Sequence, residues 1–194
     1  MIFKICGITN QEDASAAVDA GATAIGLNFY PPSPRYISPA QAGEIATAAG
    51  VRRVGVFVNE TRARVEEIAR IARLDVAQLH GDETADEFPA SIAIWKALRV
   101  SGGIEISLYD GYPVEALLLD GPANGVRFDW TIATHRPHRI ILAGGLDASN
   151  VAEAIATVRP WGVDVCSRIE SAPGKKDHKK MTEFLQAAMA AVQV

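Results

Sequence analysis

The chain has 194 residues, of which 48% are hydrophobic and 22% are charged, and its formal net charge is −4. This composition is ordinary for a soluble globular protein, and the small negative charge gives no sign of a nucleic acid or a membrane surface as partner. The two cysteines, Cys6 and Cys166, share no CxxC or Cys/His spacing, which argues against a disulfide framework and a metal site. We therefore expect a cytoplasmic protein, and no apolar run approaches the ~18 residues that span a membrane.

Short apolar runs alternate with amphipathic stretches along the chain. Several runs lack polar alternation, as expected for parallel strands that are covered on both faces. The pattern predicts eight strands, at residues 3–6, 24–29, 53–58, 75–80, 93–98, 116–120, 139–143 and 162–166.

Helix patterns fill most of the intervals between these strands. Each follows a residue suited to cap a helix N-terminus, and the predicted helices are residues 11–20, 39–49, 62–73, 148–158 and 178–192. The regions around 102–109 and 130–134, where a fifth and a sixth helix belong, are too short for full helices.

Eight strands in strict alternation give about 24 residues per unit, which suits a compact α/β protein with one (β/α)8 TIM barrel. We expect a single catalytic domain over residues 1–194, with short or missing fifth and sixth helices. The alternative is a doubly wound open sheet, which usually has a Gly-rich first turn. The turn after the first strand is Gly7-Ile8-Thr9, without a GxGxxG motif, so the barrel is favoured.

Cys6 stands where the first predicted strand ends, before a glycine turn. In such barrels the active site lies at the C-terminal ends of the strands. A thiol, with an ordinary pKa near ~8.5, can be tuned to act as a base near neutral pH. The alternative is a small buried hydrophobic residue, which is the commoner role of a free cysteine.

Asp120 ends the sixth predicted strand, directly after three leucines. A carboxyl group at the tip of an apolar strand is partly desolvated and can hold a proton for transfer. The alternative is a solvated aspartate that caps a turn. A thiol and a carboxyl group can thus meet at the mouth of the barrel.

Several other residues at the mouth could bind anionic groups. Gly144 and Gly145, after the seventh strand, can aim backbone N–H groups at a phosphate, although glycines also form ordinary tight turns. Arg35, in a proline-stiffened loop, can clamp a carboxylate or remain solvated. The basic run 174–180 either steers a phosphate or is a solvated helix start. The remaining polar candidates at strand ends are His80, Asp164, Ser167 and Arg168.

The chain resembles, over nearly its whole length and in the same order, the phosphoribosylanthranilate isomerases, which are (β/α)8-barrel enzymes of tryptophan biosynthesis. The opening segment, KICGITN at residues 4–10, is fairly specific for this family. All matching segments taken together in their order along the chain are very specific for it. The other matching segments are residues 29–38, 54–59, 78–81, 118–120, 128–130, 144–146, 162–165 and 173–177.

The resemblance implies an isomerase that converts N-(5-phosphoribosyl)anthranilate into 1-(2-carboxyphenylamino)-1-deoxyribulose 5-phosphate by an Amadori rearrangement. It implies Asp120 as the general acid, Cys6 as the general base and Arg35 as the ligand of the anthranilate carboxylate. No metal or organic cofactor is implied, because the substrate nitrogen stabilises the intermediate. The small phosphorylated substrate is the expected partner, and the chain is expected to be a monomer or a homodimer. The residues implied in substrate or phosphate binding are His80, Gly144, Gly145, Asp164, Ser167 and Arg168.

Two departures from the family pattern fall at the presumed phosphate end. The family usually carries Ser-Ser-Gly where this chain has Cys166-Ser167-Arg168, and its loop after Asp120 is richer in glycine. These departures leave open a catalytically weak barrel that binds a phosphorylated ligand. A separate alternative is another phosphoribosyl-sugar isomerase. The latter enzymes typically have an aspartate at the position of Cys6, which speaks against them.

Overall fold

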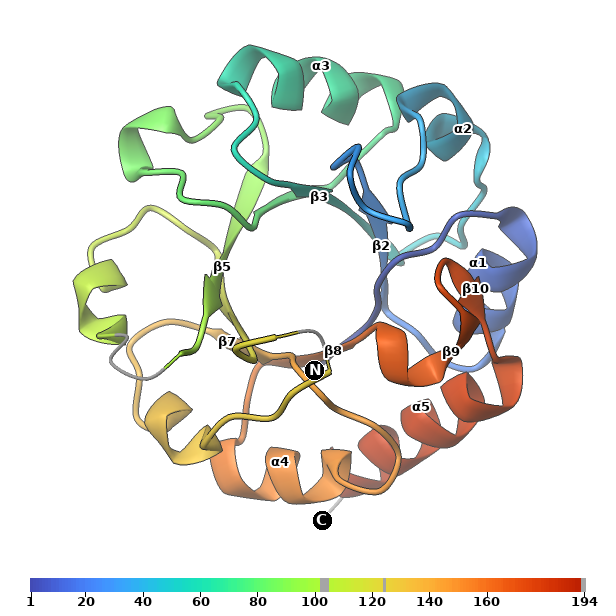
Figure 1. Ribbon diagram of the computed structural model, residues 1–194, viewed down its shortest axis with the longest axis vertical. Helices are drawn as coiled ribbons and strands as arrows, with labels where there is room; N and C mark the ends of the chain where they lie inside the picture. The colour runs from blue at the N-terminus through green and yellow to red at the C-terminus, as the bar shows by residue number, and fades with distance from the viewer. Residues whose placement is uncertain (102–104, 124, 193–194) are drawn as a thin grey trace.

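The computed structural model of the protein describes residues 1–101, 105–123 and 125–192. Eight parallel strands form a closed barrel in sequence order, so that β1 pairs with both β2 and β8 (Figure 1). This confirms the predicted (β/α)8 barrel, and each predicted strand agrees with the observed one to within one residue at either end. The strands are β1 (Ile2–Ile5), β2 (Ala24–Asn28), β3 (Arg52–Phe57), β4 (Val76–Leu79), β5 (Ala93–Arg99), β6 (Ala116–Asp120), β7 (Ile140–Leu142) and β8 (Gly162–Val165).

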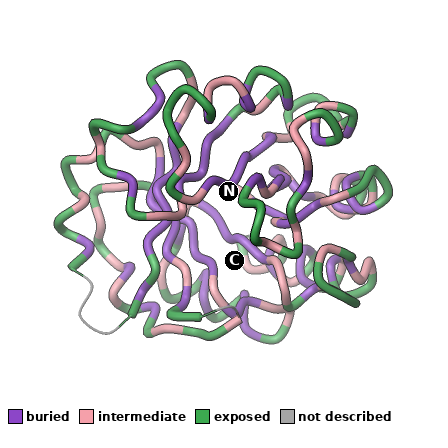
Figure 2. The backbone as a smooth tube through the Cα atoms, turned by 45° about the horizontal axis from the view of Figure 1, so that its top comes forward, coloured by how far each residue is buried: buried purple, intermediate pink, exposed green. Residues whose placement is uncertain are grey.

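The core lies in two layers, one inside the barrel and one between the strands and the outer segments. Leu118 packs inside with Trp95, whereas Leu117 and Leu119 belong to the outer layer, and all four side chains are buried. Successive side chains of a strand point to opposite faces, so a strand that is covered on both faces needs an uninterrupted apolar run. Figure 2 shows the result as buried strands inside a ring whose outer surface is exposed.

Five α-helices lie around the barrel in the described ranges. Their N-termini follow the predicted caps: Asn10 accepts a hydrogen bond from the backbone N–H of Asp13, and Ser38 forms a capping box with Gln41. The last helix has the predicted bounds. The helices are α1 (Gln11–Asp19), α2 (Pro39–Glu44), α3 (Arg62–Ile71), α4 (Val151–Val158) and α5 (His178–Val192).

Helix α2 ends five residues earlier than predicted, because a buried arginine binds its last carbonyl groups. The guanidinium of Arg53 donates to the carbonyl oxygens of Ala42 at 2.5 Å and Ile45 at 2.6 Å. The side chain of Gln11 bonds both the N–H and the C=O of Ala46. These bonds replace those of a further helical turn, which a sequence pattern does not reveal.

Two further helix boundaries differ from the prediction. Helix α4 begins three residues late, because Asp147 accepts from Ser149 and donates its own N–H to the Asn150 side chain, which makes a separate turn. Helix α3 ends two residues early, and Arg73 just beyond it has a positive φ of 51°.

In three consecutive connections, the part of the chain that the structure describes forms a single 3-10 turn and no α-helix. The predicted shortening of the fifth and sixth helices is confirmed by η2 (Ile106–Tyr109) and η3 (Trp130–Ala133), although residues 102–104 lie outside the described ranges. The connection between β4 and β5 is also reduced, to η1 (Ala85–Glu87), which the sequence analysis did not predict.

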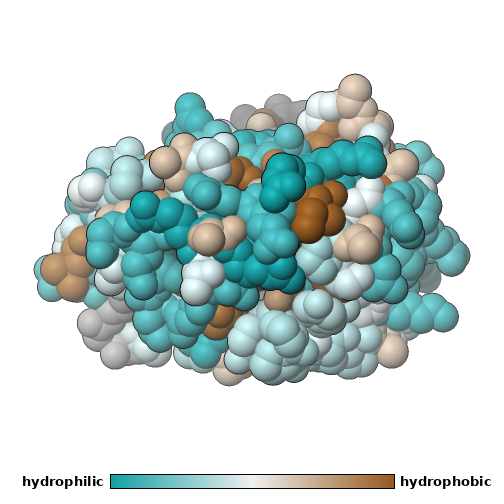
Figure 3. Space-filling view, turned by 90° about the horizontal axis from the view of Figure 1, so that it is seen from above, coloured by the Kyte–Doolittle hydropathy of each residue, from teal (hydrophilic) through white to brown (hydrophobic). Residues whose placement is uncertain are grey.

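The chain between β8 and α5 forms a 3-10 turn and a small hairpin. The turn is η4 (Ser167–Ile169), and the hairpin pairs β9 (Glu170–Ala172) with β10 (Lys175–Lys176). The hairpin lies beside α1 at the rim of the barrel (Figure 1). The side of the molecule in Figure 3 is mostly hydrophilic, with hydrophobic residues in small separate patches. No helix among the described residues is long and apolar enough to cross a membrane.

Candidate active site

A cleft of about 900 Å³ opens at the C-terminal ends of the barrel strands. Its wall takes residues from the end of every strand, because parallel strands in a closed barrel all point to the same rim. The structure brings all nine site residues predicted from the sequence into this one cleft. They are Cys6, Arg35, His80, Asp120, Gly144, Gly145, Asp164, Ser167 and Arg168.

Cys6 follows β1, and its backbone N–H donates to the carbonyl oxygen of Val165 at 2.9 Å. The thiol is half-buried and free. A hydrogen bond from the Cys166 thiol is the largest cause that lowers the pKa of Cys6 well below its usual value; burial opposes this shift, and the ammonium of Lys4 adds to it. The Cys6 thiol is therefore the more acidic of the two and can serve as a base.

Cys166 follows β8, next to Cys6, and no role was predicted for it. Donation of its hydrogen bond to Cys6 and its own burial raise the pKa of Cys166 well above the usual value. The Nζ of Lys176 lies 3.9 Å from its sulfur. The pKa values of the two neighbouring thiols therefore shift in opposite directions, downward for Cys6 and upward for Cys166.

Asp120 ends β6 and faces His80. Its Oδ1 accepts a hydrogen bond from the backbone N–H of Gly121 at 2.8 Å, and its Oδ2 lies 3.5 Å from the Nε2 of His80. The Nε2 of Gln78 lies 3.3 Å from the Nδ1 of His80. An amide NH2 group can only donate, so Nδ1 accepts and Nε2 carries the ring proton toward Asp120. The carboxyl group is thus oriented by the backbone of Gly121, with His80 beside it.

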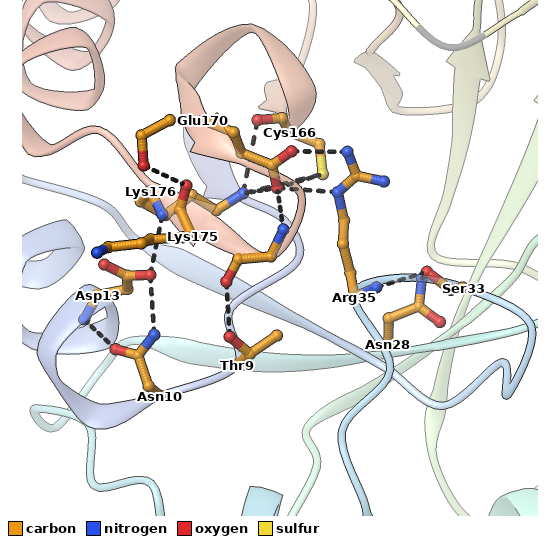
Figure 4. Close-up of polar contacts among 12 residues, drawn as sticks. Thr9, Asn10, Asp13, Asn28, Ser33, Arg35, Cys166, Glu170, Lys175 and Lys176 are labelled. Atoms are coloured by element: carbon orange, nitrogen blue, oxygen red, sulfur yellow. Dashed lines mark hydrogen bonds and ion pairs between the residues drawn. The ribbon is translucent and has the colours of Figure 1, made fainter.

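Arg35 lies in the loop after β2, and a glutamate from the hairpin binds its guanidinium. The Nε and Nη2 of Arg35 donate to the two carboxylate oxygens of Glu170 at 2.8 and 2.6 Å (Figure 4). These hydrogen bonds raise the pKa of Arg35, so the guanidinium is always charged. The sequence analysis did not foresee this pair, because nothing in the sequence links residues that are 135 positions apart.

Lys176 differs from both interpretations of the basic run 174–180. Its side chain is buried, and its Nζ donates to Glu170 at 3.0 Å. The backbone N–H of Lys176 donates to the carboxylate of Asp13 on α1 at 3.0 Å (Figure 4). Lys176 is therefore neither a solvated residue nor a phosphate-steering charge; it fixes the hairpin to the barrel.

The two glycines after β7 have positive φ angles of 77° at Gly144 and 69° at Gly145. A β-carbon on Gly144 would lie 2.2 Å from the backbone nitrogen of Gly121, and one on Gly145 would lie 2.9 Å from the carbonyl oxygen of Gly125. These glycines therefore let the loop after β6 lie against the end of β7. This packing role comes in addition to any contact with a phosphate.

The long side chain of Arg168, at the position where the resemblance implies glycine, reaches across to the loop after β6. Its Nη2 donates to the carbonyl oxygen of Gly125 at 3.1 Å. Ser167 precedes it in η4. Arg168 thus connects the ends of two strands that are not neighbours in the barrel.

Asp164 lies on β8, below this turn, and forms a buried ion pair. Its Oδ1 accepts from the Nζ of Lys4 at 2.9 Å, and the two residues are direct neighbours across the β1–β8 ladder. Sequence reasoning missed Lys4, although a lysine inside the apolar run of the first strand is the signal that could have revealed it. Within the described ranges, no cluster of three or more His, Cys, Asp or Glu side chains is arranged to hold a metal ion.

Comparisons with known proteins agree with this geometry. The family model for N-(5'phosphoribosyl)anthranilate (PRA) isomerase matches residues 3–187. The N-(5'-phosphoribosyl)anthranilate isomerase of Solibacter usitatus (strain Ellin6076) is 63% identical over 198 residues, with 99% of each chain covered. That of Trichlorobacter lovleyi is 45% identical over 201 residues, which cover 97% of this chain and 98% of the relative.

A similar structure is the crystal structure of phosphoribosyl anthranilate isomerase from Thermotoga maritima. It superimposes with a TM-score of 0.91 at 40% identity and covers 98% of this chain and all of its own. Another solved isomerase, in complex with reduced 1-(o-carboxyphenylamino)-1-deoxyribulose 5-phosphate, has a TM-score of 0.89 at 40% identity and the same coverage. From the family match and these relatives, the chain belongs to the N-(5'-phosphoribosyl)anthranilate isomerase family.

Proposed function

We propose that this protein catalyses the Amadori rearrangement of N-(5-phosphoribosyl)anthranilate in tryptophan biosynthesis. The observation that carries the proposal is a thiol with a lowered pKa, Cys6, in the same cleft as the oriented carboxyl group of Asp120. A base and an acid in one water-accessible cleft are what an aldose–ketose isomerisation needs. Membership of the isomerase family supports the same reaction.

Asp120 is the proposed general acid. It donates its proton to the furanose ring oxygen as the bond from that oxygen to C1 breaks, and the anthranilate nitrogen supplies the electron pair that forms the C1=N bond. The N–H of Gly121 and the Nε2 of His80 face the two oxygens of the carboxylate that results.

Cys6 is the proposed general base. Its thiolate takes the proton from C2 of the opened sugar, and the electron pair of the C–H bond moves toward the C1=N bond, which yields the enolamine. The enolamine then tautomerises to the ketoamine by gaining a proton at C1 and losing one from the C2 hydroxyl. Cys6 ends as a thiol and Asp120 as a carboxylate, and proton exchange with water restores both groups.

The two charged ends of the substrate have separate proposed sites. Arg35 binds the anthranilate carboxylate through Nη1, which makes no hydrogen bond within the described residues. The phosphate is bound at the other end of the cleft, by the backbone N–H groups of Gly144 and Gly145 and by the turn of Ser167 and Arg168. His80 and Asp164 line the wall between the two ends.

The proposal extends to the whole chain. Residues 1–194 act as one catalytic domain in the cytoplasm, as a monomer or a homodimer. Sedimentation of the purified protein over a range of concentrations distinguishes these two assemblies. The isomerase of Thermotoga maritima is described as dimeric, which makes the homodimer the first assembly to test.

The proposal is tested by substitution of the base. Cys6→Ala is expected to fold normally, as judged by circular dichroism, and to lose at least ~100-fold of turnover, the scale of a lost general base. Turnover is followed by the loss of anthranilate fluorescence. Cys166→Ser is the matched control, because it removes the other thiol but keeps a hydrogen-bond donor beside Cys6. A folded Cys6→Ala variant with normal turnover would exclude Cys6 as the base.

A barrel that only binds a phosphorylated ligand is the second candidate function. The observation that favours it is Arg168, in place of a glycine at the phosphate end. The same assay decides between the two: a wild-type protein that binds the product but does not turn over the substrate would support the binding protein.

A further inference from the structure

Lys4 carries a charge in the interior of the barrel, and the proposed mechanism does not use it. Its side chain is completely buried and is among the largest fully buried side chains of the chain. A buried ammonium group is strongly destabilising unless opposite charges and hydrogen bonds compensate it. Such a group calls for an explanation in terms of what lies around it.

Two acidic groups surround Lys4, one beside it and one above it. Asp164 on β8 is its lateral neighbour in the ladder, with 2.9 Å between the Nζ and the Oδ1. Cys6 lies two residues further along the chain, so both side chains point to the same face. The pair Lys4–Asp164 thus forms a charged layer directly below the layer that holds the two thiols.

Gly26 on β2 provides the closest measure of how Lys4 and Cys6 approach each other. A β-carbon on Gly26 would lie 2.7 Å from the Sγ of Cys6 and 3.1 Å from the Cε of Lys4. Both side chains therefore pack against the β2 backbone at Gly26, where no side chain stands in the way. Any side chain at residue 26 would push the ammonium and the thiol out of this arrangement.

We infer that Lys4 is a positioning residue, whose buried ammonium is held below the Cys6 thiol by Asp164 and keeps that thiol ionised before the substrate binds. The inference rests on the proposed function of Cys6 as the base. Lys4 touches no reacting atom and acts only through Cys6.

The charges of the neighbouring groups agree with this role. Burial is the largest cause that raises the pKa of Asp164, to about 7; Lys4 opposes the shift, and the negative charge of Cys6 adds to it. The attraction of Asp164 and Cys6 outweighs burial and raises the pKa of Lys4, so the ammonium never loses its proton in the working range.

Other titratable groups also face the thiol. Cys166 after β8 donates its hydrogen bond, Lys176 on β10 contributes a positive charge, and Arg35 after β2 interacts with the charge of Cys6. The contribution of Lys4 must therefore be measured with these three groups held constant.

The test measures the pKa of Cys6 from the pH dependence of its alkylation by iodoacetamide. All proteins carry Cys166→Ser, which leaves Cys6 as the only thiol of the chain. In this background, Asp164→Asn removes the anion that competes for Lys4 and is expected to lower the pKa of Cys6. Lys4→Met with Asp164→Asn removes the whole ion pair without leaving a buried charge and is expected to raise it by about 1–3 units.

A second buried lysine offers a matched control. Lys96 on β5 is also buried, and its Nζ lies 2.7 Å from the carboxylate of Glu83. Lys96→Met with Glu83→Gln removes an equivalent ion pair and is expected to leave the pKa of Cys6 unchanged. This control separates the effect of the Lys4 charge from a general loosening of the barrel.

Opposite shifts in the two Asp164 variants support the inference, because a structural disturbance alone has no reason to change sign. An unchanged pKa of Cys6 without Lys4, or a shift in the same direction in both variants, overturns it. If the double variant does not fold, Lys4→Gln with Asp164→Asn replaces it, since two amides can bond each other. The alkylation experiment does not depend on turnover. A wrong assignment of the base would therefore show as normal turnover of Cys6→Ala, whereas a wrong role for Lys4 would show as an unchanged pKa of Cys6.

Discussion

Glu170 binds Arg35 through both oxygens of its carboxylate, and thereby holds the loop after β2 against the hairpin after β8 (Figure 4). Paired parallel hydrogen bonds of this type fix the plane of a guanidinium as well as its position. The arginine proposed to bind the substrate carboxylate is thus oriented before the substrate arrives. Part of its charge is already balanced by Glu170, which weakens its attraction for a further carboxylate.

Arg35→Ala is expected to weaken binding of the carboxylated product by about 1.5–3 kcal/mol, the scale of a hydrogen-bonded charge pair. The binding free energy of an analogue without the carboxylate should decrease much less in the same variant. Glu170→Gln is the control, because it breaks the ion pair but retains the guanidinium. Isothermal titration with both ligands measures the difference, and equal losses for the two ligands would assign Arg35 to structure alone.

Asp120→Asn is expected to reduce turnover by ~10²–10⁴-fold, because an amide cannot deliver a proton to the ring oxygen. Substrate binding should survive, since the amide keeps the shape of the carboxyl group. Single-turnover kinetics separate the two effects. His80→Gln, which retains a donor toward Asp120, should cost far less turnover. Wild-type rates in the Asp120→Asn protein would mean that another group supplies the proton.

Arg168→Ala is expected to weaken binding of inorganic phosphate by up to about fivefold, because an exposed ion pair contributes about 1 kcal/mol at most. The loss should shrink as salt screens the pair. Arg159→Ala, at an exposed arginine after the C-terminus of α4, should have no effect. Phosphate affinity that is unchanged across a salt series would leave Arg168 only its contact with Gly125.

Asp13 is expected to make the stability of the fold depend on acidity. Burial acts to raise the pKa of Asp13, but hydrogen bonds from the backbone of Lys176 and from the side chains of His178 and Asn10 outweigh it and leave the pKa lowered. Because the folded value is depressed, this stabilisation is complete above the unfolded pKa, near ~3.9, and is lost as the pH falls through the folded value.

Denaturant unfolding of the wild type and of Asp13→Asn checks this prediction. The substitution should lower the free energy of unfolding by about 1.5–3 kcal/mol at neutral pH, as expected for buried hydrogen bonds to a charged group. The difference between the two proteins should narrow below about pH 4. A constant difference at all pH values would show that the charge of Asp13 is not involved.

The apolar runs alone predict the eight strands and their order, because a strand covered on both faces leaves a distinct pattern. The closed barrel then brings the residues at the strand ends into one cleft, which is why Cys6 and Asp120 could be singled out from the sequence. Helix ends were less predictable: α2 stops at Glu44 because of the guanidinium of Arg53, a contact between elements that no local pattern reports.

The ion pairs within the site could not be predicted from the sequence. Glu170 meets Arg35, and Lys4 meets Asp164 over 160 positions of the chain. Such pairs depend on the register of β1 against β8 and on the placement of a hairpin. The alternation of side chains along a strand does, however, place Lys4 and Cys6 on one face. A charged residue inside an apolar strand is therefore a signal from which a role for Lys4 could have been predicted.

The three 3-10 turns that replace helices divide the ring of outer segments into two unequal arcs. Within the described residues, the arc behind β5 and β6 has η1, η2 and η3 as its helical cover, whereas α1, α2 and α5 cover the strands on the other side (Figure 1). Local opening costs less free energy where fewer contacts must break. Amide hydrogens in the arc covered by 3-10 turns should therefore exchange with solvent faster than those in the arc covered by α-helices. Asp120 belongs to the arc covered by 3-10 turns, and Cys6 belongs to the arc covered by α-helices. The proposed acid and the proposed base therefore stand on parts of the barrel with different helical cover, and warming is expected to open the surroundings of Asp120 before the whole chain unfolds.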